Sequence, residues 1–187
     1  TQNLIGCGNS LSPRPAARKR LKLATQQTTM PEFEMGGTTR RAWWGDYKAA
    51  DFADIDPAAT IAVLPVAAIE QHGPHLPIST DTAIMTGMLE AVVSRLPDDL
   101  DMRILPIQAV GKSDEHVYAP GTLTLLPATL IEAWTELGAS VARAGVKKLV
   151  FVNSHGGNEE IIGIVARNLR VRFDMLAVKT SWERFGR

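Results

Sequence analysis

The chain has 187 residues, a length that fits one domain with its own hydrophobic core. Twenty basic residues balance twenty acidic ones, and no run approaches the roughly 18 apolar residues of a membrane-spanning helix. These features argue against nucleic-acid or membrane partners, and we expect a cytoplasmic protein. Because Cys7 is the only cysteine, an internal disulfide and a thiolate zinc site are excluded, and any metal must be held by nitrogen and oxygen.

Residues 1–39 differ in composition from the rest of the chain. Residues 1–31 contain no acidic residue, and five basic residues lie there among Ser, Thr, Gln and Pro: Arg14, Arg18, Lys19, Arg20 and Lys22. A segment of this composition buries too little apolar surface to fold by itself. We therefore expect residues 1–39 to be a disordered or non-native leader, the alternatives being a transit peptide and a natural start at Met30.

The globular pattern begins near residue 40 with a strand followed by a helix. Residues 60–68, TIAVLPVAA, are apolar almost throughout, which is typical of a parallel strand covered on both faces. Residues 81–96 carry apolar side chains at spacings of three and four residues, so they predict a helix that Pro97 ends. A second strand is expected at residues 102–110.

The second half of the chain continues this alternation. The polar, Gly- and Pro-containing residues 111–121 predict a loop, and residues 122–126 a short strand. Pro127 begins a predicted helix that runs to about residue 144, with Gly145 as its left-handed cap. Further strands are expected at residues 148–153 and 175–180, separated by a helix that Asn158 caps.

This order of elements predicts an α/β fold with three layers, α/β/α, around a largely parallel sheet. In such sheets, functional groups gather beyond the carboxyl ends of the strands. Both of the most polar, histidine-containing segments, residues 70–81 and 153–158, follow predicted strands. We therefore expect the functional site at this edge of the sheet.

The segment EQHGPHLPISTD brings two carboxylates and two imidazoles close together in sequence: Glu70, His72, His75 and Asp81. In extended backbone the first and third residues of Glu-x-His point to the same side, so Glu70 and His72 can chelate one ion or two adjacent ions. Carboxylate and imidazole ligands suit Zn, Mn or Fe. The alternative is an ordinary polar turn after a strand.

The segment VNSHGGN places His155 at the same predicted edge of the sheet. The glycines behind it, Gly156 and Gly157, permit a close backbone approach and positive φ, which a substrate or metal crowded against the main chain would require. Taken alone, a glycine-rich turn explains this segment equally well.

Together these segments resemble the creatininase family. That family carries Glu-x-His-Gly-x-His-Leu-Pro, then Thr-Asp, and later Gly-His-Gly-Gly-Asn after a strand; here the motifs are EQHGPHLP, Thr80-Asp81 and SHGGN. The intervening GKSDEHVYAPGT is similar to the family's Ser-x-Glu-His followed by Pro-Gly-Thr. The resemblance runs in order from about residue 62 to residue 158, and it implies a creatininase-like domain over residues 40–187.

The resemblance also implies the chemistry. It predicts a metal-dependent amidohydrolase that cleaves a C–N bond other than a peptide bond, in a small cyclic amide or formamide, through a hydroxide between two divalent ions. In this scheme Asp81 bridges the ions, and three further ligands complete the coordination: Glu70, His72 and His155. Glu115 and His116 are predicted to bind substrate or move a proton, the alternative being a solvated loop pair.

Supporting roles follow from general chemistry. His75 is expected to brace the loop or a ligand carboxylate, because outer groups orient metal ligands. An oxyanion donor could come from Gln71 or from a backbone N–H of Gly156 or Gly157. As partners, the resemblance implies a small amide substrate and a homo-oligomer such as a hexamer.

The chain also departs from the family pattern. Gly157 stands where members with creatinine activity carry a glutamate ligand, and the later His-Ala-Gly … Glu-Thr-Ser segment of other members is absent before Arg187. We therefore expect a C-terminally incomplete or degenerate member that holds metal weakly. A non-catalytic binding or assembly module is the alternative function. A nuclease or peptidase is disfavoured by the neutral charge and the lack of a basic groove.

Overall fold

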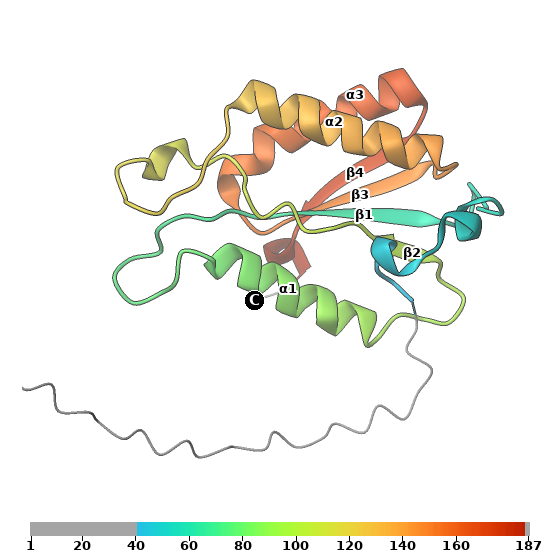
Figure 1. The fold of residues 1–187 in the computed structure, drawn as a ribbon, viewed down its shortest axis with the longest axis horizontal. Helices are drawn as coiled ribbons and strands as arrows, with labels where there is room; N and C mark the ends of the chain where they lie inside the picture. The colour runs from blue at the N-terminus through green and yellow to red at the C-terminus, as the bar shows by residue number, and fades with distance from the viewer. Residues whose placement is uncertain (1–40, 186–187) are drawn as a thin grey trace, which may run out of the picture. The chain divides into compact units, whose positions relative to one another are not determined.

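The computed structural model describes residues 41–185, so the predicted leader lies outside the described residues. Four strands form one parallel sheet in the order β2-β1-β3-β4 (Figure 1). They are β1 (Ile61–Val66), β2 (Met102–Ile104), β3 (Lys148–Asn153) and β4 (Leu176–Ser181). Since every pair of neighbours is parallel, the strands end at one common edge.

Helices cover both faces of this sheet. Helix α1 (Thr80–Val93) lies against one face, and helices α2 (Pro127–Arg143) and α3 (Glu159–Phe173) lie side by side on the other (Figure 1). Short 3-10 segments occur at Trp44–Asp46, Ala49–Phe52, Asp114–His116, Gly156–Asn158 and Trp182–Phe185. The predicted three-layer α/β/α architecture is confirmed.

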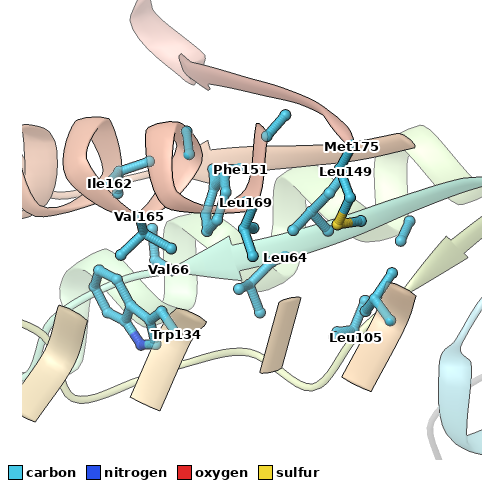
Figure 2. Close-up of a cluster of buried hydrophobic side chains, with 14 of the residues drawn as sticks. Leu64, Val66, Leu105, Trp134, Leu149, Phe151, Ile162, Val165, Leu169 and Met175 are labelled. Atoms are coloured by element: carbon cyan, nitrogen blue, oxygen red, sulfur yellow. The ribbon is translucent and has the colours of Figure 1, made fainter. Parts of the chain in front are cut away.

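Strand β1 supplies side chains to two separate cores. Leu64 and Val66 pack towards α2 and α3, against Trp134 and Phe151 among others (Figure 2). Val63 points the opposite way, into a smaller cluster that includes residues of α1. Because alternate residues of a strand face opposite sides, a strand covered on both faces needs apolar residues throughout. This explains the unbroken hydrophobicity of residues 60–68.

The structure corrects the extents of three predicted elements. The second strand covers only Met102–Ile104; after Leu105 donates to the Val63 carbonyl, the hydrogen bonding to β1 resumes only at Gln108, which donates to the Pro65 carbonyl. Residues 122–126 form no strand; Leu123 makes only an isolated bridge with Ile69. Helix α1 ends at Val93, three residues before the predicted end. The remaining elements lie within one or two residues of their predicted positions, and Gly145 has the predicted positive φ of 92°.

The register of the sheet aligns the ends of its central strands. Val66 of β1 is paired with Asn153 of β3, which is paired with Ser181 of β4. The segments that follow β1 and β3 therefore leave the sheet at the same level. Within residues 41–185, no helix combines the length and apolar character needed to cross a lipid bilayer.

Candidate metal centre

The centre is assembled from the segments that follow β1 and β3 and from the first turn of α1. The loop after β1 is closed by a hydrogen bond from the Glu70 N–H to the Ile78 carbonyl, 2.9 Å long. Asp81 lies in the first turn of α1. Ser154, directly after β3, donates its hydroxyl to the Asp81 carbonyl at 2.9 Å and so joins the two segments.

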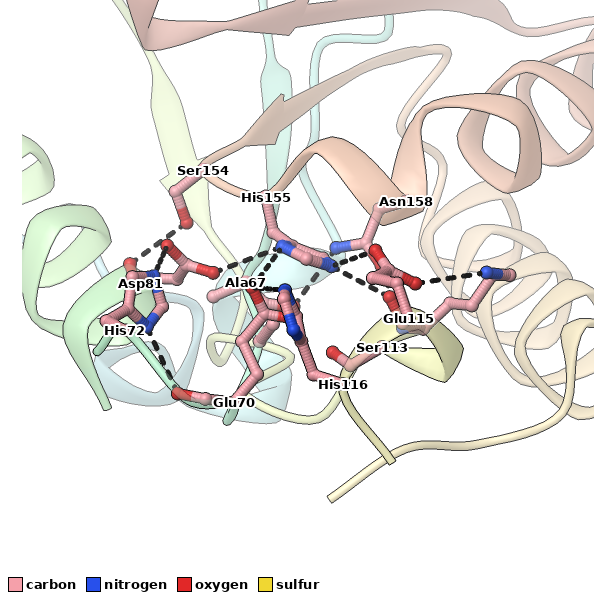
Figure 3. Close-up of polar contacts among 12 residues, drawn as sticks. Ala67, Glu70, His72, Asp81, Ser113, Glu115, His116, Ser154, His155 and Asn158 are labelled. Carbon is pink, nitrogen blue, oxygen red and sulfur yellow. Dashed lines mark hydrogen bonds and ion pairs between the residues drawn. The ribbon is translucent and has the colours of Figure 1, made fainter. Parts of the chain in front are cut away.

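Three of the predicted ligands meet at one buried point. Single ligand atoms of Glu70, Asp81 and His155 all lie within 4.8 Å of one another (Figure 3). The exposed fractions of these residues are 5%, 6% and 8%. Nδ1 of His155 lies 3.3 Å from Glu70 Oε1 and 3.2 Å from Asp81 Oδ2. Two carboxylates and one imidazole therefore share a site that water hardly reaches.

The orientation of His155 is determined by a backbone carbonyl. Its Nε2 lies 2.7 Å from the carbonyl oxygen of Lys112. A carbonyl can only accept, so Nε2 carries a proton and donates it. In the neutral ring, the remaining lone pair is then on Nδ1, which faces Glu70 and Asp81. Metal-binding histidines are commonly oriented in this way by an outer acceptor.

His72 has the same arrangement with the two nitrogens exchanged. Its Nδ1 lies 3.0 Å from the Glu70 carbonyl oxygen, and its Nε2 lies 3.1 Å from Asp81 Oδ1. The Asp81 carboxylate is thus flanked by two imidazoles, with Oδ1 facing His72 and Oδ2 facing His155 (Figure 3). An unprotonated nitrogen and a carboxylate oxygen repel at such distances, so either a proton or a cation must lie between them.

The buried oxygens of this cluster fit a cation. Glu70 Oε2 is buried and accepts no hydrogen bond from the described residues, and the buried Asp81 Oδ2 accepts one only when His155 Nδ1, 3.2 Å away, carries a proton. A buried charged oxygen without a partner costs several kcal/mol, of order 2–7 even for a neutral polar group. Two carboxylates and two imidazoles with inward lone pairs form the nitrogen and oxygen donor set that Zn, Mn and Fe accept.

The structure places the two predicted catalytic residues differently. His116 Nε2 lies 3.7 Å from Glu70 Oε1, beside the buried cluster. Glu115 lies behind His155, on the Nε2 side, with Oε1 3.8 Å from that nitrogen and Oε2 3.5 Å from Lys112 Nζ. A hydrogen bond from its own backbone N–H, assisted by the charge of Lys112, lowers the pKa of Glu115. Glu115 therefore carries a negative charge and lies close to the Nε2 side of the His155 ring.

Two supporting predictions need correction. His75 is exposed and makes no hydrogen bond within residues 41–185, so it does not brace a ligand. Gly156 and Gly157 both have negative φ. The second glycine is required for space instead: a Cβ on Gly157 would lie 2.4 Å from the Lys112 carbonyl oxygen and 2.5 Å from His155 Nε2.

Sequence reasoning missed how Asn158 supports the site. It precedes α3 as predicted, but its side chain makes no capping hydrogen bond. Instead its Nδ2 donates to the Ala67 carbonyl at 3.0 Å and its Oδ1 accepts from the Lys112 N–H at 3.0 Å. This fully buried amide therefore ties the end of β1 to the loop whose carbonyl orients His155. Only its place in the SHGGN motif could have suggested a role.

Comparison with known protein families shows which family this chain belongs to. The Creatininase family model, described as creatinine amidohydrolase, matches residues 45–187. The chain belongs to the creatininase family. The prediction made from the motifs is confirmed.

Individual relatives and structures agree with this membership. The mycofactocin precursor peptide peptidase of Mycolicibacterium smegmatis is 39% identical over 112 residues, covering 59% of this chain and 45% of the relative. The creatinine amidohydrolase of Pseudomonas putida is 30% identical over 136 residues, covering 68% of this chain and 49% of the relative.

Solved structures are similar as well. A manganese creatininase structure has a TM-score of 0.67 at 26% identity, covering 78% of this chain and 60% of that one. A mutant creatininase of Zn-Zn type has a TM-score of 0.64, with 26% identity and the same coverage. The chain spans about half the length of the curated relatives it matches.

Protonation of His155 connects this creatininase-family site to pH. Burial disfavours the charged ring, but the Asp81 carboxylate, the hydrogen bond to the Lys112 carbonyl and the charge of Glu70 outweigh it. The pKa of His155 therefore lies above its ordinary value. In the metal-free chain, a proton on Nδ1 takes the place that a cation would occupy.

We expect pH to act in opposite directions on the metal-free and metal-bound chain. A cation must displace the Nδ1 proton, so its affinity should fall by up to about tenfold per pH unit below the His155 pKa. Because the folded-state pKa is raised, protonated His155 stabilises the metal-free fold at low pH, and this contribution is lost as pH rises through that pKa. Thermal melts with and without Zn between pH 5.5 and 8.5 test this. A metal-induced shift in Tm that does not grow with pH would contradict it.

Proposed function

We propose that this chain carries the metal centre of a metal-dependent amidohydrolase. The observation that carries the proposal is the pair of imidazoles around Asp81. His72 and His155 each donate a hydrogen bond from one ring N–H to a backbone carbonyl, and the other ring nitrogen faces this carboxylate, at 3.1 and 3.2 Å. Two histidines that are each oriented by a backbone carbonyl, and that both face one buried carboxylate, are typical of metal ligands and are not required for the stability of the fold.

We assign four ligands, Glu70, His72, Asp81 and His155, and two divalent ions. Two ions are favoured because the two Asp81 oxygens face different histidines, as a bridging carboxylate requires. The similar creatininase of Zn-Zn type is consistent with this number. Bound here, the cations would lower the pKa of a water molecule and polarise an amide carbonyl.

The chain's own residues account for the remaining requirements. The two carboxylates bring the negative charge that offsets the cations, and burial of the cluster keeps the site at low dielectric, where electrostatic interactions are stronger. Glu115 and the Lys112 carbonyl hold the His155 ring from behind. His116 lies beside Glu70, where a side chain can exchange a hydrogen bond with a substrate.

The substrate class is the finer part of the proposal. We favour a small non-peptide amide, cyclic or N-formyl, in line with the creatinine amidohydrolase relative and with a similar mutant creatininase that is complexed with creatine. A peptide bond is the second candidate, because the relative with 39% identity is called a precursor peptide peptidase. This restores the peptidase alternative that the neutral charge of the sequence had disfavoured.

A substrate panel tests the function. We expect Mn- or Zn-loaded protein to release amine from cyclic amides or N-formyl amines, and chelation to abolish the release. Short peptides assayed in parallel by mass spectrometry decide between the two candidates. The His72→Gln variant should lose turnover, whereas His75→Gln should keep it, because His75 is exposed and outside the cluster. If no substrate is turned over while equilibrium dialysis finds no bound metal, the non-catalytic module replaces this proposal.

A further inference from the structure

The side-chain amide of Gln71 contacts three groups: the Gly73 N–H, the His116 ring and the Tyr118 hydroxyl. Its Oε1 accepts a hydrogen bond from the Gly73 backbone N–H at 2.9 Å. Its Nε2 lies 3.1 Å from His116 Nδ1 and 3.2 Å from the Tyr118 hydroxyl. The two amide protons and the amide oxygen are therefore all engaged. Gln71 has no free N–H for an oxyanion, which removes it from the predicted donors.

The backbone of Gly73 determines which way this amide points. If the amide were turned over, its NH₂ group would face the Gly73 N–H, and two donors would oppose each other in place of a hydrogen bond. Nε2 must therefore be the atom that faces His116. Because an NH₂ group can only donate here, His116 Nδ1 must accept.

An accepting Nδ1 leaves the single proton of the neutral ring on Nε2. That nitrogen lies 3.7 Å from Glu70 Oε1, at the edge of the buried cluster. The same reasoning gives the opposite result for His72 and His155, whose outer partners are carbonyls. Those two rings direct a lone pair into the centre, whereas His116 directs an N–H towards it.

We infer that Gln71 is a positioning residue that holds His116 in the Nε2–H form, so that His116 donates a hydrogen bond to the substrate carbonyl oxygen and is not a metal ligand. The part concerning the substrate rests on the proposed function; the choice of tautomer does not. A donor aimed at the carbonyl oxygen would stabilise the negative charge that develops there when water attacks an amide.

The decisive variant is Gln71→Glu. It keeps the size of the side chain and an oxygen that accepts from the Gly73 N–H, but it presents an acceptor to His116 where the amide presented a donor. The ring should respond by carrying its proton on Nδ1. Gln71→Leu removes the donor without adding an acceptor, and should give a mixture of both tautomers even if the glutamate variant folds poorly.

The primary measurement is the nitrogen NMR spectrum of the histidine rings, with and without Zn. The chain has four histidines, and His116→Gln identifies the signal of interest. We expect wild-type His116 to show the Nε2–H pattern and Gln71→Glu to show proton occupancy at Nδ1. In kinetic assays, Gln71→Glu should lower kcat by about 100-fold or more with little change in KM, as expected for a lost oxyanion donor.

Two control variants and four outcomes complete the test. Tyr118→Phe and His75→Gln should leave the His116 tautomer unchanged, since neither removes the Gln71 NH₂ group that donates to His116 Nδ1. An Nδ1–H pattern in the wild type, or an unchanged Nε2–H pattern in Gln71→Glu, would overturn the inference. A tautomer switch with unchanged kcat would overturn the substrate-donor part. The predicted switch in a protein without amidase activity would support the tautomer inference and reject the proposed function.

Discussion

Replacing Asp81 with asparagine is expected to weaken divalent metal binding by at least about 100-fold while leaving the fold intact. Asp81 is the carboxylate that both His72 and His155 face, so its loss removes the negative charge from both halves of the centre. Loss of an outer partner of a metal ligand typically costs about 10 to 100-fold in affinity, so on the proposed assignment of Asp81 as a ligand shared by two ions its loss should cost at least about 100-fold. Asparagine keeps the shape of the side chain, so the effect reports on charge.

Calorimetric titration of Zn or Mn into both proteins measures this loss directly. At a metal concentration well above the Kd of both proteins, a 100-fold weaker affinity removes about 2.7 kcal/mol of metal-dependent stabilisation, which thermal melts would also detect. Glu90→Gln is the matched control, because it removes the same charge from an exposed position on the same helix. Equal metal binding by wild type and Asp81→Asn would show that Asp81 is not a ligand.

Replacing Gly157 with alanine is expected to damage the fold and the metal centre together. The added Cβ would lie 2.4 Å from the Lys112 carbonyl oxygen, 2.5 Å from His155 Nε2 and 2.8 Å from Glu115 Oε1. These groups form the outer support of His155, so relief of the clash must break the hydrogen bond that orients the ring. Overpacking of this kind costs about 1–3 kcal/mol of stability. Metal affinity should also fall by about 10 to 100-fold.

The neighbouring glycine provides the control for this experiment. A Cβ on Gly156 would meet nothing within 4 Å, and both glycines have negative φ, so backbone conformation does not distinguish them. We expect Gly156→Ala to change urea-induced unfolding and metal affinity little. Similar losses in the two variants would mean that the 3-10 turn, and not the crowding at Gly157, limits substitution.

The same crowding accounts for the glycine where the resemblance to the creatininase family led us to look for a glutamate. The resemblance implied a glutamate ligand at position 157 in members with creatinine activity. In this chain, the Lys112 carbonyl and the Glu115 carboxylate occupy the space that any side chain at Gly157 would enter. The loop of residues 111–121 and the glycine are therefore complementary.

Much of the fold follows from local patterns in the sequence. The unbroken apolar run of β1 predicted a strand covered on both faces, because a strand exposes alternate residues to opposite layers. The parallel order predicted that segments after β1 and β3 would meet at one edge, and Glu70 and His155 do meet there. Strand β2 was overestimated, since apolar composition alone does not show that regular pairing with β1 stops after Ile104 and that a hydrogen bond to β1 returns only at Gln108.

The sequence by itself determined the family, the layered fold and which side chains carry nitrogen and oxygen donors, because these depend on motifs and on the periodicity of apolar residues. Only the tertiary structure decided which ring nitrogen of each histidine faces the centre. His155 receives that orientation from the carbonyl of Lys112, which is 43 residues away in the chain, and His116 from the amide of Gln71, which is 45 residues away. Hydrogen-bond polarity between distant segments leaves no periodic trace in a sequence, so it emerges only when the segments are brought together.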